Sequence, residues 1–246
     1  MKNQLLQLSK IVLMLFLLGI TVKVFPFEKF KTKNSVISIM NDVTEKHSTL
    51  LEPQSLIPQF KIKENKFEGY TFRLINLSNV SLNPVAQYSI EASPMILSNE
   101  IKRDSEIKQL EDSIILNLSN SLSDTSGRSH SSVYLPIAKE LTTLSLSEAD
   151  TKILVVNSDL MENTQQLSFY DRLSFEKLHS NIDVIKNKFE KSYSIPNLKG
   201  IQVYLIYQPT STSTDTAFKL ISQVYKQLLT EKGAEVYIQA NFIKAK

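Results

Sequence analysis

The sequence predicts an α/β fold in three layers, with a mostly parallel β-sheet covered by helices on both faces. From Tyr70 onward, short apolar runs typical of strands alternate with longer amphipathic segments. In a βαβ unit a helix carries the chain back across the sheet, so this alternation favours parallel strands. The composition agrees, because 42% apolar and 22% charged residues are ordinary values for a globular domain.

Five segments predict strands. Residues 70–78 combine aromatic and aliphatic side chains and end in a Ser-Asn pair, and residues 86–92 alternate as a half-exposed strand does. Of the three later segments, the first two are almost wholly apolar, as in strands that are buried on both faces. These three are 152–157, 201–207 and 235–240.

Four segments predict helices between these strands. The first, 98–122, places Ile107, Leu110, Ile114 and Leu118 on one face, at steps of three and four residues. Gly233 predicts the end of the last helix, because glycine readily takes the left-handed conformation that often follows one. The other three helices are expected at 131–144, 170–191 and 215–232.

Residues 1–33 have the features of a signal peptide or a signal anchor. An unbroken apolar run at 11–22 follows a basic start, and 24–27 extend it past a single lysine. No small-x-small cleavage site follows, which favours an uncleaved anchor over a secreted or periplasmic product. We therefore expect a single-pass protein of a bacterial cytoplasmic membrane, tethered through residues 11–27, with its domain outside the cytoplasm.

Residues 34–69 lack strong periodicity and contain Pro53 and Pro58, so we expect a stalk or lead-in there. Residues 70–246 then form the α/β domain. Residues 1–33 hold six lysines and one glutamate, +5 in all, so the remainder carries +3 − 5 = −2. A nearly neutral, slightly acidic domain gives no indication of nucleic-acid binding.

Motifs for catalysis are absent from the sequence. The chain has no cysteine, which excludes disulfides, thiolate metal sites and a cysteine nucleophile. It has neither a G-x-S-x-G elbow nor a glycine-rich phosphate loop. We expect a binding role, and a divalent-metal-dependent hydrolase or a purely structural envelope component remain as alternatives.

Serine, asparagine and aspartate gather where predicted strands end, at 77–83 and 156–163, and at 127–137 before a helix. In open parallel sheets, ligands bind beyond the carboxyl ends of the strands. The layout over 70–241 resembles a von Willebrand factor A-type domain. That resemblance implies a Rossmann-like sheet and a metal-ion-dependent adhesion site, in which Asp-x-Ser-x-Ser follows the first strand, with a Thr and an Asp from later loops.

The resemblance assigns five residues to a degenerate version of this metal site. Asn79, Ser81 and Asn83 stand at the three positions of Asp-x-Ser-x-Ser, so Asn replaces both the Asp and the last Ser. Ser131 stands at the position of the Thr, and Asp159 stands at the position of the later Asp. One charged ligand predicts weak binding of Mg²⁺ or Mn²⁺. Turn formation and helix capping are the competing interpretations of these residues. The five are Asn79, Ser81, Asn83, Ser131 and Asp159.

The same loops predict a surface for a protein partner within an envelope-associated complex. Their polar side chains follow predicted strands or precede a predicted helix, at the carboxyl ends of the strands, where Rossmann-like sheets bind their ligands. No other partner is indicated apart from the membrane. The residues expected to contact the partner are Ser78, Asn79, His130, Ser132, Glu162 and Asn163.

Overall fold

The computed structural model describes residues 32–43, 51–77, 83–94, 99–121 and 132–245. The chain divides into two compact units, residues 1–32 and 33–246, and the account below concerns the second. Within the described residues no helix is long and apolar enough to cross a bilayer. The expected membrane segment, 11–27, lies outside them.

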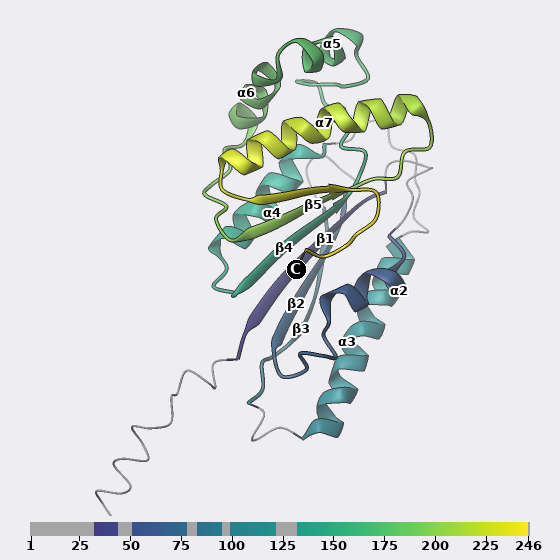
Figure 1. The fold of residues 1–246 in the computed structure, drawn as a ribbon, viewed down its shortest axis with the longest axis vertical. Coiled ribbons are helices and arrows are strands. Elements are labelled where there is room, and N and C mark those ends of the chain that lie inside the picture. Colours follow the sequence, from purple (N-terminus) through teal and green to yellow (C-terminus); the bar gives the residue numbers. More distant parts are fainter. Residues whose placement is uncertain (1–31, 44–50, 78–82, 95–98, 122–131, 246) are drawn as a thin grey trace, which may run out of the picture. The chain divides into compact units, whose positions relative to one another are not determined.

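The second unit is built on one six-stranded sheet, in the order β3-β2-β1-β4-β5-β6 (Figure 1). Every neighbouring pair of strands is parallel except β2 and β3, which run antiparallel. This confirms the predicted mostly parallel, Rossmann-like α/β fold. The strands are β1 (Asn34–Asp42), β2 (Gly69–Leu77), β3 (Val85–Ile90), β4 (Thr151–Asn157), β5 (Ile201–Ile206) and β6 (Glu235–Gln239).

Helices cover both faces of the sheet, as predicted (Figure 1). One face carries α4 (Tyr134–Leu146), α5 (Arg172–Ser180), α6 (Ile182–Ser192) and α7 (Thr212–Glu231). The other carries α2 (Pro53–Leu56), the 3₁₀ helix η2 (Ile57–Phe60) and α3 (Glu100–Ser121). The apolar stripe expected on the 98–122 helix is the buried face of α3.

The expected stalk at 34–69 is wrong. Its first residues form β1, which lies in the middle of the sheet and pairs in parallel with β2 and β4. Ile37 and Ile39 face the α3 layer, whereas Met40 faces the α4 layer, so the strand is buried on both faces. Polar residues interrupt its apolar pattern, which is why the periodicity was weak.

The expected helix at 170–191 is two helices. The helix is interrupted at Asn181, whose backbone (φ −160°, ψ 87°) is not helical, and α6 starts at the next residue. Leu178 of α5 and Ile185 of α6 still pack into the same core. The other helices and strands begin and end within a few residues of the expected positions. Gly233 ends α7 with a left-handed φ of 97°, as predicted.

A buried ion pair joins α4 to the sheet. Glu140 of α4 is 5% exposed, and its carboxylate accepts hydrogen bonds from Arg73 of β2 at 2.6 and 3.1 Å. The same carboxylate accepts one from the hydroxyl of Ser38 in β1, at 2.6 Å. The hydrogen bond to Glu140 raises the pKa of Arg73. Two strands and one helix therefore meet at a single carboxylate.

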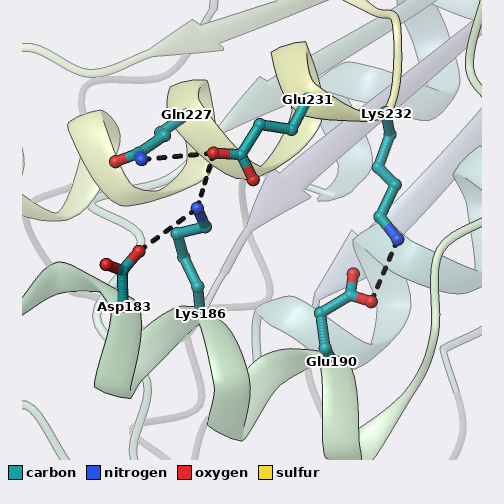
Figure 2. A network of polar contacts seen from close by, with 6 residues as sticks. All are labelled: Asp183, Lys186, Glu190, Gln227, Glu231 and Lys232. Carbon is teal, nitrogen blue, oxygen red and sulfur yellow. Dashed lines mark hydrogen bonds and ion pairs between the residues drawn. The ribbon is translucent and has the colours of Figure 1, made fainter.

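A more exposed polar network joins α6 to α7 (Figure 2). The Lys186 ammonium lies 2.6 Å from Glu231 and 3.4 Å from Asp183, and Lys232 lies 3.0 Å from Glu190. The Lys186 hydrogen bond lowers the pKa of the Glu231 carboxyl. Because the Glu231 side chain is 51% exposed, water and salt screen this network more than they screen Glu140.

Removing Arg73 should therefore be costly. Arg73→Met leaves the Glu140 carboxylate buried without its cation, and we expect a loss of about 3–5 kcal/mol in the free energy of unfolding. Arg73→Met/Glu140→Met should lose less than Arg73→Met alone, because no unpaired charge remains. Urea unfolding of Arg73→Met, Glu140→Met and the double variant measures these losses and whether they add. Lys186→Met is the control and should cost less than about 1 kcal/mol; additive effects of the Arg73 and Glu140 changes would contradict this account.

Candidate functional site

The candidate site lies at the carboxyl ends of β1 and β4. These strands are neighbours, with Asn41 opposite Asn157, yet the chain continues from β1 to β2 on one side and from β4 to β5 on the other. The connections thus diverge here, which is where open parallel sheets form a crevice for ligands. Both strands end in polar residues that are buried.

Asp42 and Ser158 link the two strand ends. Asp42, the last residue of β1, is 2% exposed, and its Oδ2 accepts a hydrogen bond from the Ser158 hydroxyl at 2.7 Å. The Ser158 oxygen in turn accepts one from the backbone N–H of Leu160, at 2.9 Å. Asp159 is 8% exposed, and its Oδ1 accepts from the Met161 N–H at 2.9 Å.

Leu160 turns the chain sharply after Asp159. Its φ of 63° is left-handed, a conformation that costs a residue with a Cβ about 1–2 kcal/mol. Its side chain is fully buried in the core on the α4 face, which offsets that cost. The turn is therefore stabilised by the packing of the Leu160 side chain. Two hydrogen bonds add to this, from the Leu160 N–H to Ser158 and from the Met161 N–H to Asp159.

Glu162 caps α4 from a distant loop. Its Oε2 accepts hydrogen bonds from the backbone N–H groups of Val133 and Tyr134, both at 2.9 Å. These are donors that the first turn of a helix cannot satisfy internally, and a carboxylate also suits the positive end of the helix dipole. Burial raises the pKa of Glu162, while the hydrogen bonds from Tyr134 and Val133 oppose the rise.

Residues 162–169 form an ordered hairpin beside this cap. The Phe169 N–H donates to the Glu162 carbonyl, and the Thr164 N–H donates to the Leu167 carbonyl, both at 2.9 Å. The Ser168 hydroxyl donates to Asn163 at 3.0 Å. Gln165 and Gln166 at its tip are exposed. Glu162 therefore caps α4 with its side chain and closes the base of this hairpin with its backbone carbonyl.

Tyr225 of α7 lies under the site. Its hydroxyl is fully buried and has no hydrogen-bond partner among the described residues. Burial raises its pKa well above the usual value, and the negative charges of Glu162, Asp159 and Asp42 add to the rise. An unpaired buried hydroxyl costs about 1–3 kcal/mol, so this polar group is unusual for a well-packed core.

The structure places some of the predicted site residues and not others. Asn83, Ser132, Asp159, Glu162 and Asn163 are described. Asp159 follows the end of β4, whereas Asn83 precedes β3. Ser78, Asn79, Ser81, His130 and Ser131 lie outside the described residues, so their assignment to metal or partner stays a prediction.

Two expectations about these residues need correction. The first strand of the sheet is β1, not 70–78, so the loop at 79–83 follows the second strand and its match to the family motif loses its basis. Ser132 and Glu162, which we expected at a partner-binding surface, are 5% and 4% exposed. Glu162 is occupied in capping α4, and Ser132 lies within hydrogen-bonding reach of it.

Sequence reasoning missed Asp42 and Ser158. Asp42 lies two residues after the run Val36 to Met40, in which Ser38 interrupts the apolar pattern. Because of that interruption the run does not indicate a strand. The described residues contain no cluster of three or more His, Cys, Asp or Glu side chains arranged to hold a metal ion. The oxygen donors at these two strand ends are the carboxylates of Asp42 and Asp159 and the Ser158 hydroxyl. Such a set suits a hard cation that keeps several waters.

Comparison with known proteins adds a distant structural likeness. No protein-family model and no curated protein matches the sequence. Among solved structures, the chain is similar to a mutant of the PilB minor pilin from Streptococcus sanguinis, at 10% sequence identity and a TM-score of 0.47. The match covers 86% of this chain and 58% of that one. A likeness this distant says nothing about function.

The raised pKa of Glu162 predicts how stability depends on pH. As pH rises above about 4.5, the ordinary glutamate value, the unfolded chain releases this proton before the native chain does. Wild type should therefore lose stability relative to Glu162→Gln with rising pH, until the native carboxyl has also ionised. Urea unfolding across this range tests the sign. Glu64→Gln, at an exposed position, is the control. If wild type gains unfolding free energy relative to Glu162→Gln as pH rises, the raised pKa of Glu162 is wrong.

Proposed function

We propose that this chain is a membrane-tethered interaction module. It binds a protein partner through the loops at the carboxyl ends of β1 and β4. Residues 11–27 supply the tether, and the domain lies outside the cytoplasmic membrane of a bacterium as part of an envelope complex. The observation that carries the proposal is the buried Asp42–Ser158 link beside Asp159, at the edge where the connections of the parallel sheet diverge.

The ordered hairpin at 162–169 supports recognition of a partner at this crevice. It stands beside Asp159, and its conformation is fixed by internal hydrogen bonds and by the Glu162 cap. A loop that is already ordered loses little conformational entropy when it binds. Its exposed tip offers two uncharged amide side chains, Gln165 and Gln166, that can both donate and accept hydrogen bonds.

A divalent cation at Asp42 and Asp159 is part of the same proposal. Asp42 ends β1 and Asp159 follows β4, so the two carboxylates lie at the ends of neighbouring strands. Both side chains are nearly excluded from water, at 2% and 8% exposure. Mg²⁺ or Mn²⁺ would neutralise them and leave coordination positions for water or for a carboxylate of the partner.

Thermal unfolding of the full-length chain in mild detergent tests the cation. With a dissociation constant near 1 mM, about 10 mM Mg²⁺ should stabilise the native state by about 1.4 kcal/mol, or raise Tm by roughly 3–6 °C. The rise should vanish in Asp42→Asn and Asp159→Asn and persist in Asp112→Asn, an exposed control on α3. The cation assignment fails if wild type and Asp42→Asn respond alike.

Photo-crosslinking in native membranes tests the partner surface. A photoreactive residue at Gln165, on the hairpin tip, should give one adduct of defined mass. The same residue at Gln223, exposed on α7, should not give that adduct. Equal adducts from both positions, or none from Gln165, would refute recognition at this end of the sheet, whatever the metal result.

A further inference from the structure

Strand β3 leaves one edge of the sheet open. It pairs with β2, and no other strand in the described part of the chain pairs with it. Along an edge strand, every second residue points its N–H and C=O away from the sheet. These groups are a template for an additional strand.

The features that usually protect an edge strand are missing from β3. Its six residues, Val85–Ile90, include no charged side chain and no proline. Its register with β2 runs without a bulge from Tyr70 opposite Ile90 to Ile75 opposite Val85. Val85 is 46% exposed. Natural proteins commonly use charges, prolines or bulges to prevent pairing at such an edge.

A groove of about 680 Å³ runs along this edge, between β3 and α3. Tyr88, Ile90 and Leu110 supply its apolar part, and Gln109 and Ser113 of α3 supply polar groups along its wall. A strand placed beside β3 would turn alternate side chains toward α3. The groove thus provides both main-chain hydrogen bonds and a surface that contacts every second side chain.

The accessible charge in the groove is negative. Glu91 follows β3 directly, is exposed, and forms no ion pair within the described residues. Glu106 lines the α3 wall, is 40% exposed, and pairs with Lys102 at 3.6 Å and with Arg103 at 3.5 Å. Arg103, the one cation in the lining, is 5% exposed, so the charge that a ligand reaches most readily is the carboxylate of Glu91. A basic ligand therefore matches the groove better than an acidic one.

We propose that β3 and α3 bind an extended, basic peptide segment of another protein, which adds to the sheet beside β3. A single strand fits because it brings no helix with it. In a second copy paired through β3, its own α3 would lie on the same face, where this α3 already packs over β3. The peptide thus gains main-chain hydrogen bonds along β3 and charge contacts at Glu91 and Glu106.

The test uses the full-length chain in mild detergent and two blocked eight-residue peptides. One alternates Lys with Val, and the other alternates Glu with Val. Fluorescence anisotropy should show saturable binding of the Lys–Val peptide, with the Glu–Val peptide at least about tenfold weaker. Hydrogen exchange should show that the Lys–Val peptide protects amides of Val85–Ile90.

A matched pair of variants locates the binding. Gln109→Lys puts a cation in the groove and should weaken the Lys–Val peptide by roughly threefold to tenfold. Gln223→Lys makes the same change on α7, on the other face of the sheet, and should leave binding unchanged. Equal weakening by both variants, or no saturable binding, overturns the proposal. So does protection of β3 that depends on protein concentration without peptide, since that would identify a second copy as the occupant.

Discussion

The position of β1 in the middle of the sheet determines most of this structure. Because β1 pairs in parallel on both sides, crossover connections must carry the chain away from it in two directions. Those connections place helices on both faces and bury residues 37–42 of the strand. They also bring the ends of β1 and β4 together, so that Asp42 and Ser158 come into contact although 116 residues separate them.

A strand buried on both faces has no water to satisfy its polar side chains, so β1 depends on partners from elsewhere. Ser38 finds Glu140 on α4, and Glu140 in turn pairs with Arg73 on β2. Buried pairs of this kind contribute little net stability, yet leaving one partner alone is costly. If α4 slid along the sheet, Glu140 would separate from Arg73 and Ser38 and remain buried without a partner. The contacts among these three residues therefore favour one position of α4 on the sheet.

The same dependence explains what the sequence could and could not predict. Strands β4 and β5 each carry an unbroken apolar run, 153–156 and 203–206, and α3 carries a complete apolar stripe, so their local patterns suffice. The pattern of β1 is interrupted by Ser38, whose partner lies 102 residues away. Without β1, the segment 70–78 becomes the first predicted strand, and no local pattern points to Asp42. Asp159 is predicted because it follows an apolar strand.

The two edges of the sheet are built differently. Each parallel connection on the β4 side adds a helix to the α4 face, and the last of these helices, α7, packs against the edge strand β6. β3 instead returns directly beside β2 without a crossover helix. Its chain then continues into α3 on one face, so that Gln87 and Ser89 stay exposed. Divergent connections thus bring the polar ends of β1 and β4 together, and the reversed strand β3 forms one wall of the groove at the edge.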